Sequence, residues 1–586
     1  MRNLFLTLSA MTAVLAANAG TTWMLGTSEF TVDTLYSATA GPGVVTTGLK
    51  ITNPSNTTVL HYSVIDLTNP NLEIHGVEAY DDGDLVETVK SMGDRKSEDT
   101  GKQYIAGVNG DYFNMGDSPT RTNCHAMADD ILYNLAVTDN GFLSYVTVAG
   151  DKDIRIFENL NASLDLNFPD GTKYPFGVNG TRATDQIRIY TTAFGDTTGT
   201  NMWGTECEAK VIEGREGKDG SVLEITGAPE SGVGSMKIKE GYVVLSGHGA
   251  GAAILKDIKV GDRVTIGHTI SLDDRELNIS QMIGGMSMLL IEGQLPTRGQ
   301  LTQPVNHFTS NQARTVIGYN EDRTKLIMLV ADKYGSQLSQ DPFKQTFPEK
   351  STGLVMRRMA FIMQQLGCYT AMAYDGGGSS QLYNYGFGVR NTPYGGDYLR
   401  PVANGIFAVS NTPVDENIAY IEAVYKDVML NEGESHTPLV YAYNQYGVVV
   451  NNDFKDYKLT VAEGLGTVAD KTFTAGNAKG STVAVIEGAG AKCGVRIYTN
   501  GGGDYVTSGD DKAPVFAEKP YVSDDPMGSD KLPDDSGIGE IIADTDDCLT
   551  DCAPVYYNLQ GMRVQNPANG IYIIRRGNKV SKQYIR

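Results

Sequence analysis

Between about residues 21 and 409, most hydrophobic positions follow the alternation of β-strands. In HYSVIDLTNPNLEIHGVEAY (61–80), apolar and polar residues alternate with a period of two, which is typical of half-buried strands. In GAAILKDIKVGDRVTI (251–266), the pattern predicts an apolar strand, a turn at Gly261-Asp262 and a second strand. Turns rich in glycine, asparagine and aspartate separate such stretches, so this region is predicted to be rich in sheet.

One segment has the period of a helix. In GLVMRRMAFIMQQLG (353–367), Val355, Met359, Ile362 and Leu366 recur at helical spacing, and Gly367 is placed to end the helix. The next residues, CYTAMAY (368–374), form a short apolar run that predicts a buried strand. A helix among many strands gives an α+β fold over residues 20–411.

Residues 412–508 show short strands with regular turns and almost no helical period, which predicts a β-sandwich (Ig-like) module. Residues 509–553 are dense in Asp, Pro, Gly and Ser and are predicted to be an acidic linker. Residues 554–586 return to a short β-rich tail, with a hairpin turn at Gly577-Asn578. The YNLQG.RV…GIYI arrangement of this tail resembles the sorting tails of secreted Bacteroidetes proteins. A last hairpin packed on the preceding domain is the alternative.

The N-terminus predicts secretion. Residues 1–19 combine Arg2, a short apolar run and an Ala17-Asn18-Ala19 cleavage site, as in a signal peptide cleaved after Ala19. We therefore expect a secreted, periplasmic or cell-surface protein, with secretion or sorting machinery as a possible partner of the tail. The formal net charge of −22 argues against nucleic acid as a partner. No later apolar run has the length of a membrane span, and no Cys or His spacing indicates zinc.

The stretch AYDGGGSSQLY (373–383) is the strongest candidate for a site. Asp375 and three glycines follow the predicted strand, and apolar residues frame the turn on both sides, so a flexible linker does not fit. No Lys follows the glycines as in a P-loop, and neither Ser379 nor Ser380 stands in G-x-S-x-G. What remains is a tight turn that presents a carboxylate, backbone N–H donors and hydroxyls.

Two further stretches have a similar form. YIAGVNGDYFNMGD (104–117) runs from small apolar residues into a turn at Asn109-Gly110-Asp111. In QARTVIGYNEDRTKLIMLVAD (312–332), Arg314 begins an apolar strand, a turn follows, and Asp332 ends the second strand. Arginine is the side chain best shaped to bind a phosphate through two parallel hydrogen bonds.

These motifs occur in the order of a known family. VNGDYF, IGGMSMLLIEGQ, ARTVIGYNEDRTKLIMLVAD, STGLVMRRMAFIMQQLG, AMAYDGGGSSQLY and LRPVANGIFAV together resemble the phosphodiester glycosidase family, over roughly Gly41 to Val409. VVLSGHGAGAAILKDIKVGDRVTI looks like a segment that many bacterial members carry between the halves of the site. The chain departs from the family at Asp332-Lys333-Tyr334-Gly335, where D-G-R is usual, and in the insertion that follows.

The resemblance implies a catalytic domain that hydrolyses a sugar–phosphate diester, such as a GlcNAc-1-phosphodiester, in a glycan or a small molecule. It implies Asp375 and Asp111 as the carboxylates and Arg314 as the phosphate-binding cation. Substrate-binding groups would be Asn109, Gly110, the amides of Gly376 and Gly377, Ser379 and, as a second cation, Arg400. No cofactor and no metal are implied. Which carboxylate acts as base or nucleophile stays open.

Two other functions remain possible on the same residues. One is a non-catalytic carbohydrate-binding or adhesin protein that keeps the fold as a scaffold. Two acidic residues beside an anionic ligand argue against it, because binding alone does not require them. The other is a phosphodiesterase that cleaves the P–O bond instead of the C1–O bond.

Overall fold

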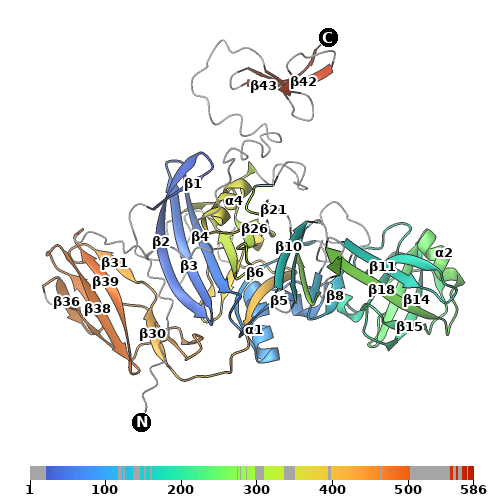
Figure 1. Cartoon of the computed structure of the whole chain (residues 1–586), viewed down its shortest axis with the longest axis horizontal. Helices are drawn as coiled ribbons and strands as arrows, with labels where there is room; N and C mark the ends of the chain where they lie inside the picture. Colours follow the sequence, from blue (N-terminus) through green and yellow to red (C-terminus); the bar gives the residue numbers. More distant parts are fainter. Residues whose placement is uncertain are drawn as a thin grey trace.

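The structure is a computed structural model of the whole chain (Figure 1). It describes residues 21–501 and 555–585, apart from the following segments: 116–121, 123–125, 136–144, 151–152, 159–160, 273–274, 277–278, 286, 297–308, 335–349, 393–397, 462–463, 558–562, 565–569 and 577–578. The expected signal peptide (1–19) and acidic linker (509–553) therefore lie outside the described residues. The described part of the chain is mostly β-sheet, with 52% of these residues in strands and 10% in helices, as the alternating pattern predicts.

An eight-stranded sheet, the main sheet, forms the centre of the molecule (Figure 1). Its strands in spatial order are β1 (Thr21–Leu25), β2 (Ser28–Gly41), β3 (Val44–Asn53), β4 (Asn56–Asp66), β23 (Lys325–Ala331), β22 (Arg314–Tyr319), β26 (Thr370–Ala373) and β21 (Ser287–Leu290). The predicted strands of the Arg314 motif and of CYTAMAY are thus confirmed. Segments more than 250 residues apart become neighbours here, because β4 pairs with β23, for example Lys325 with Asp66.

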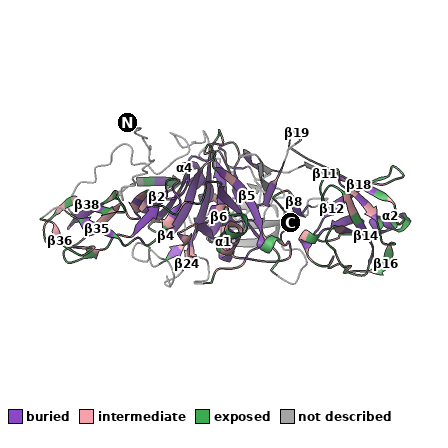
Figure 2. Cartoon of the chain, turned by 90° about the horizontal axis from the view of Figure 1, so that it is seen from below, coloured by how far each residue is buried: buried purple, intermediate pink, exposed green. Residues whose placement is uncertain are grey.

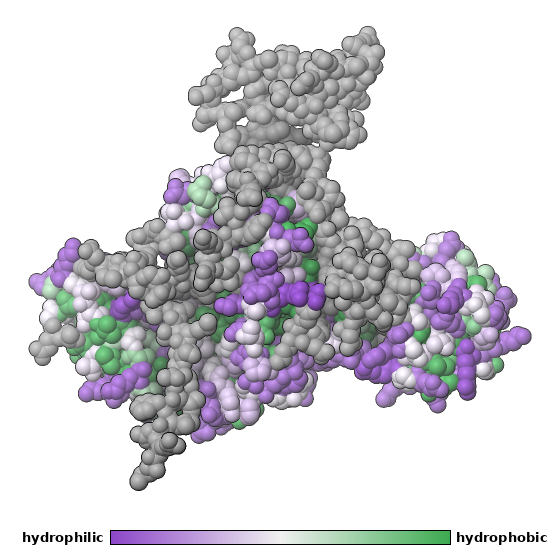
Figure 3. Space-filling view, viewed as in Figure 1, coloured by the Kyte–Doolittle hydropathy of each residue, from purple (hydrophilic) through white to green (hydrophobic). Residues whose placement is uncertain are grey.

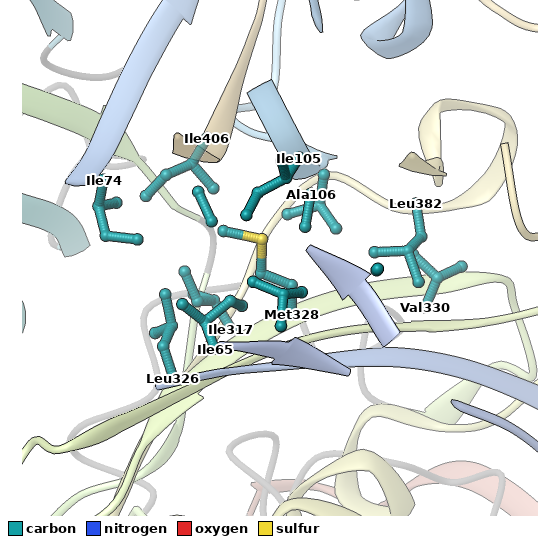
Figure 4. Packing of buried hydrophobic residues seen from close by; sticks show 14 of the residues in the cluster. Ile65, Ile74, Ile105, Ala106, Ile317, Leu326, Met328, Val330, Leu382 and Ile406 are labelled. Atoms are coloured by element: carbon teal, nitrogen blue, oxygen red, sulfur yellow. The ribbon is translucent and has the colours of Figure 1, made fainter. Parts of the chain in front are cut away.

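A five-stranded sheet, the second sheet, packs on one face of the main sheet. Its strands in order are β28 (Gly388–Val389), β27 (Leu382–Asn384), β6 (Gln103–Asn109), β29 (Asn404–Ser410) and β5 (Leu72–Glu78). The core between the sheets holds Ile65, Ile317 and Met328 from the main sheet against Ile105 and Ile406 from the second (Figure 4). Each such side chain contributes roughly 1.5–3 kcal/mol when fully buried.

The outer faces of both sheets are covered by helices. Helix α4 (Met356–Gln365) packs on the main sheet, and Gly367, with φ of +81°, follows its end as predicted. Helix α1 (Val89–Thr100) packs on the second sheet. The burial of strand β4 on both faces differs from the half-buried strand that its alternation predicts. The reason is that the second sheet covers one face and α4 with its neighbours covers the other (Figure 2).

A small sheet and a closed β-barrel are inserted between the two halves of the main sheet. The small sheet contains β10 (Asp153–Glu158), β9 (Tyr145–Gly150), β20 (Gln281–Gly284), β7 (Ala126–Ala128) and β8 (Ile131–Asn134). The insert barrel contains β11 (Asn161–Asn167), β12 (Lys173–Val178), β13 (Ile187–Tyr190), β14 (Gly204–Glu213), β15 (Val222–Ile225), β16 (Glu230–Val233), β17 (Tyr242–His248), β18 (Arg263–Leu272) and β19 (Arg275–Glu276). The barrel closes because β11 also pairs with β18. Its face in Figure 3 is dominated by hydrophilic residues.

One element of the insert barrel differs from the strand that its sequence predicts. The apolar run that begins at Gly251 was expected to be a strand, but Ala250–Asp257 form helix α2. The helix starts where the backbone N–H of Ala250 donates to the Asp185 carboxylate (2.8 Å), which satisfies a donor of the first turn. The strand expected after Gly261-Asp262 is present as β18.

Residues 412–501 form three small antiparallel or mixed sheets around their own core. These are β30 (Tyr420–Ala423) with β33 (Val440–Tyr443) and β34 (Val449–Asn451); β31 (Asp427–Leu430) with β39 (Ala491–Thr499), β38 (Gly480–Gly488) and β35 (Tyr457–Thr460); and β32 (Ser435–His436) with β37 (Thr472–Ala475) and β36 (Gly466–Ala469). The all-strand character is as predicted, and the Ig-like assignment stays a prediction. We call this unit the C-terminal module.

The C-terminal module shares a core with the two-sheet domain. The rings of Phe387 and Tyr441 lie 4.5 Å apart, and both belong to the hydrophobic cluster between the two sheets. The Asn452 side chain also donates to the carbonyl of Gly386 (2.6 Å). The module is therefore packed against the segment that joins β27 to β28.

The remaining strands are short. In the tail, β40 (Val555–Tyr557), β41 (Arg563–Val564), β42 (Gly570–Arg576) and β43 (Lys579–Ile585) form an antiparallel sheet, and β42 pairs with β43 as the predicted hairpin requires. Elsewhere β24 (Lys333–Tyr334) pairs with β25 (Ser351–Thr352). Within the described part of the chain, none of the helices has the length and apolar character needed to cross a bilayer.

Candidate active site

The strand order brings the sequence motifs to one edge of the two stacked sheets. Strands β22 and β26 are antiparallel, with Val316 opposite Ala373, so the start of β22 and the end of β26 lie at the same edge. In the second sheet Gly405 pairs with Asn109, so the end of β6 lies beside the start of β29. Arg314, Asp375 and the Asn109–Asp111 turn therefore occupy neighbouring strand ends.

Hydrogen bonds connect these strand ends across the two sheets. The Asp375 N–H donates to the carbonyl of Gly110 (3.0 Å), and the Asn109 side chain donates to the carbonyl of Asp375 (2.8 Å). The Thr315 hydroxyl, on the face of β22 toward the second sheet, donates to the Asn109 side-chain oxygen (2.7 Å). The Asn109–Asp111 turn and the Asp375 turn are thus held as one unit.

Two glycines of the Asp375 turn stand where another residue would be strained or would clash. Gly377 has φ of +62°, a backbone conformation that favours glycine, and its N–H donates to the carbonyl of Ala313 (2.9 Å). A Cβ on Gly378 would lie 2.5 Å from a guanidinium nitrogen of Arg400. The missing side chain lets Arg400 lie directly over the turn, where it donates to the hydroxyl of Ser379 at 3.4 Å.

The Asp375 carboxyl is the most strongly perturbed of the predicted acids. Burial raises its pKa to about 6, although hydrogen bonds from Ser379 and the Gly376 N–H and the charges of Arg400 and Arg314 act in the opposite direction. The Gly376 N–H lies 2.8 Å from a carboxylate oxygen of Asp375. A carboxyl with this pKa can hold or release a proton near neutral pH, as a catalytic acid or base must.

Arg314 lies on the face of the main sheet that α4 covers, and it is 96% buried. Its guanidinium donates to the carbonyls of Leu354 (3.2 Å) and Ser310 (2.8 Å). Burial lowers its pKa to about 10, so it stays cationic at neutral pH, and its charge acts on Asp375. The charges of Asp375, Arg314 and Asp111 all act on the Tyr112 phenol, which lies within their electrostatic reach. Burial raises the pKa of this phenol, so it stays protonated.

A buried polar network supports the turn from below. The Asn391 side chain donates to the carbonyl of Ser380 (2.9 Å) and to the carboxylate of Asp332 (3.1 Å), and its oxygen accepts the N–H of Leu382 (2.8 Å). His61 pairs with the same carboxylate at 3.2 Å. Asp332 matches the first residue of D-G-R, and the sequence departs from that motif from Lys333 onward. Through Asn391, the Asp332 carboxylate holds the chain at Ser380 and Leu382.

The structure brings together the predicted set Asn109, Gly110, Asp111, Arg314, Asp375, Gly376, Gly377, Ser379 and Arg400. The side chains of Asp111, Arg314 and Asp375 are buried, whereas Gly376, Gly377 and Arg400 are partly exposed. Within the described ranges, no three His, Cys, Asp or Glu side chains are grouped to hold a metal ion.

Sequence reasoning missed two polar residues beside this set. Glu78, at the end of β5, and Asn404, at the start of β29, are both buried and joined by a hydrogen bond of 2.9 Å. The Asn404 oxygen in turn accepts the N–H of Asp111 at 2.9 Å. The available signal was a charged residue that ends the apolar strand LEIHGVE.

The described residues form a sheet-rich domain, and one comparison concerns its family. Residues 216–409 match the phosphodiester glycosidase family, so the chain carries a phosphodiester glycosidase domain over these residues. Arg314, Asp375, Ser379 and Arg400 fall inside the matched range. Asn109–Asp111 and Glu78 come before it and reach the site through the strand order of the second sheet.

Several solved structures are similar to the chain, while no curated protein sequence matches it. A hypothetical protein from Synechocystis has 14% identity and a TM-score of 0.48 over 63% of this chain, and the chain spans 62% of that protein. A candidate exported protein from Burkholderia pseudomallei has 18% identity and a TM-score of 0.46, with 60% of this chain and 74% of that chain covered. The zebrafish N-acetylglucosamine-1-phosphodiester alpha-N-acetylglucosaminidase catalytic domain, auto-inhibited by its pro-peptide, has 13% identity and a TM-score of 0.28, with 64% and 87% covered.

Proposed function

We propose that this protein hydrolyses the sugar C1–O bond of a glycosyl-1-phosphodiester and releases a free sugar and a phosphomonoester. One observation carries the proposal: Asp375, Asp111 and Arg314 meet at a single edge of the stacked sheets, where Asp375 has a pKa of about 6. The match of residues 216–409 to the phosphodiester glycosidase family supports the reaction class. A substrate resembling GlcNAc-1-phosphodiester follows from the resemblance of the motifs.

The two carboxyl groups serve the sugar side of the reaction. Breaking the C1–O bond gives an oxocarbenium-like transition state, which nearby carboxylates stabilise or which water attacks with the help of a base. The oxygen of water becomes the C1 hydroxyl, and the bond electrons leave with the phosphate oxygen. Asp375 is suited to accept or return the water proton near neutral pH, and Asp111 contributes a second negative group beside it.

The cations serve the phosphate side. Arg400 is only partly buried and lies over Gly378, so its guanidinium is the accessible cation of the turn. Arg314 donates to two carbonyls and adds positive charge from below. Fixed donors that face the charge on the leaving group contribute most when they are aligned before the reaction. The amides of Gly376 and Gly377, which the resemblance implies as phosphate donors, are already used within the turn: they donate to the Asp375 carboxylate (2.8 Å) and to the Ala313 carbonyl (2.9 Å). The Ser379 hydroxyl likewise bonds to Asp375, so these groups hold the turn and Arg400 is left as the donor for the phosphate.

A secreted location is part of the proposal. The signal-peptide pattern of residues 1–19 and the resemblance of residues 554–586 to a sorting tail support export or display at the cell surface. An exported enzyme of this class would act on phosphodiester-linked glycans outside the cytoplasm.

Hydrolysis in ¹⁸O-labelled water tests the proposal. The full-length protein would be incubated with α-N-acetylglucosamine-1-phosphate methyl diester and related glycosyl phosphodiesters, and the products analysed by mass spectrometry. Label on the C1 hydroxyl of the sugar supports the proposal. Label on the phosphate would show a phosphodiesterase instead, and glycan binding without any cleavage would show a carbohydrate-binding protein.

A further inference from the structure

Glu78 and Asn404 form a buried pair directly behind Asp111. Neither side chain is more than 1% exposed. The side-chain amide of Asn404 bonds to both neighbours. Its oxygen accepts the N–H of Asp111 (2.9 Å), and its nitrogen donates to Glu78 Oε1 (2.9 Å). The pair therefore connects the end of β5, the start of β29 and the turn after β6.

Glu78 determines which way the Asn404 amide faces. An amide side chain can exchange its oxygen and nitrogen by rotation, and its partners decide the orientation. The Asp111 N–H needs an acceptor, and only the oxygen of Asn404 can supply one. In the observed orientation, the Asn404 nitrogen donates to the Glu78 carboxyl oxygen. If the Asn404 amide were rotated by half a turn, its nitrogen would face the Asp111 N–H, and two donors without an acceptor would cost free energy in this buried position.

The charge state of Glu78 fits this arrangement. Burial raises its pKa to about 8, and the charges of Asp111 and Asp81 act in the same direction, against the hydrogen bond from Asn404. Tyr133 of β8 also lies within its electrostatic reach, and Arg95 of α1 donates to its backbone carbonyl rather than to its carboxyl group. Among the described residues, no partner bonds to Glu78 Oε2, which is then free to carry the proton.

Other buried glutamates are held differently. Glu87 is buried in the same region, yet its carboxylate accepts from the Arg95 guanidinium, the Ser91 hydroxyl and the Tyr80 N–H. In the insert barrel, Glu206 accepts from three hydroxyl groups and one backbone N–H. Such donors satisfy the oxygens of a buried carboxyl group. For the Glu78 carboxyl group, the Asn404 amide is the one side-chain donor within the described residues.

We propose that Glu78 is a positioning residue of this site, which fixes the Asn404 amide and through it Asp111, and which does so as a neutral carboxylic acid. The proposal rests on the proposed function and extends it. While Glu78 is neutral, it adds no negative charge behind Asp111, so that an anionic phosphodiester can approach. Ionised Glu78 would add a second negative charge and repel that substrate.

The test compares Glu78→Gln and Glu78→Leu in the full-length protein with Glu206→Gln as the matched control. Steady-state rates on the glycosyl phosphodiester that the wild type cleaves would be measured from pH 6 to pH 9.5. In the wild type, one ionisation near pH 8 lowers kcat/KM about tenfold by pH 9, mainly through KM. Glu78→Gln keeps the acceptor without the charge, so its rate at pH 7 stays within about threefold of wild type and the alkaline decrease disappears.

Glu78→Leu removes the acceptor, and kcat/KM is expected to fall about a hundredfold at every pH. Glu206→Gln is expected to keep both the rate and the pH profile of the wild type. An unchanged alkaline decrease in Glu78→Gln, or full activity in Glu78→Leu, would overturn the proposal. If Glu78→Leu does not fold, as judged by thermal unfolding, the profile of Glu78→Gln alone decides.

An infrared pH titration separates this proposal from the proposed function, because it needs no activity. The wild type should show the carbonyl band of a buried protonated carboxyl group, which disappears with a midpoint near pH 8 and is absent in Glu78→Gln. If the band is present but no phosphodiester is cleaved, the proposed function fails while the neutral acid stands. If the band is missing from the wild type, Glu78 is ionised and the positioning role as stated is wrong.

Discussion

The candidate active site and the insert barrel both bury acidic side chains, but they give these side chains different numbers of hydrogen-bond donors. In the insert barrel, Glu206 is fully buried and accepts hydrogen bonds from Thr198, Thr200 and Ser246 and from a backbone amide. At the candidate site, burial raises the pKa of Asp375 to about 6 and that of Glu78 to about 8. Donors at the site therefore compensate for only part of the lost hydration.

The comparison distinguishes a structural acid from a reactive one. A buried carboxyl group whose oxygens are all hydrogen-bonded, like that of Glu206, stabilises the strands and loops that supply its donors. A buried carboxyl with too few donors is destabilising for the fold, and groups of this kind are concentrated at functional sites. The insert barrel thus holds its buried acid in a full set of donors, whereas the two stacked sheets leave the acids of the candidate site with few.

The largest expected effect comes from removing the charge of Asp375. Asp375→Asn keeps the shape of the side chain but removes its ability to transfer a proton, so phosphodiester hydrolysis should fall about a thousandfold. Glu206→Gln is the matched control in the insert barrel and should change the rate less than about twofold. Initial rates together with thermal unfolding check the prediction. Equal losses in both variants would contradict the distinction between the two kinds of acid.

For the free energy of unfolding, Glu206→Gln should have the larger effect and Asp375→Asn the smaller one. Glu206→Gln replaces an acceptor of several buried hydrogen bonds by a group that is partly a donor, which should lower the free energy of unfolding by about 2 kcal/mol. Asp375→Asn relieves an unfavourable buried charge and should leave stability unchanged or higher. Chemical denaturation followed by circular dichroism measures both values, and a barrel variant as stable as the wild type would count against the structural role of Glu206.

A smaller effect is expected at Arg400. Arg400→Met removes the accessible cation of the turn, and loss of about 1.5 kcal/mol of phosphate binding should raise KM about tenfold, with a lesser change in kcat. Gly378→Ala offers an independent test, because its Cβ would lie 2.5 Å from the guanidinium and would displace it while the charge remains in the protein. Steady-state kinetics of both variants should agree. A KM unchanged in both would remove Arg400 from the phosphate site.

The smallest expected effect is a decrease of stability with rising pH. Although burial alone would lower it, pairing with the Tyr36 hydroxyl and the Asp332 carboxylate raises the pKa of His61 to about 9. A raised folded-state pKa gives stability that is complete below the unfolded value and is lost as the pH rises through the folded value. The contribution of Glu78 to stability has the same pH dependence, because its folded-state pKa is also raised, and this contribution is fully lost once the pH passes about 8.

Melting temperatures at pH 6, 7.5 and 9 check this prediction. The wild type should become less stable across this range, and the slope should be shallower in Glu78→Gln and in His61→Gln. A melting temperature that rises toward pH 9 would contradict the assignment of both groups.

Much of the site could be predicted from sequence because its residues stand in turns after apolar strands. Asp375, Asp111 and Arg314 each follow or begin a strand with a clear apolar run, and antiparallel pairing places such ends at one edge. Glu78 and Asn404 could not be found in this way. Their importance depends on a pairing between β5 and β29, more than three hundred residues apart, which no local pattern contains.

The fold shows the same limit. The period of 353–367 predicts α4 correctly, since a helical pattern of this length is local information. The run at Gly251 is short and apolar, and such a run fits a strand or a helix equally well until its neighbours are known. Likewise, the burial of β4 on both faces follows from stacking of the second sheet rather than from its own alternation.

The shared core between the two-sheet domain and the C-terminal module has a practical consequence. Phe387 and Tyr36 on one side and Tyr441, Tyr443 and Val449 on the other belong to a single hydrophobic cluster. A shortened protein that stops after Ser410 would leave this patch facing water, and it would tend to self-associate. A shortened protein that keeps this patch covered therefore extends through the C-terminal module, which contacts Gly386 and Phe387 between β27 and β28.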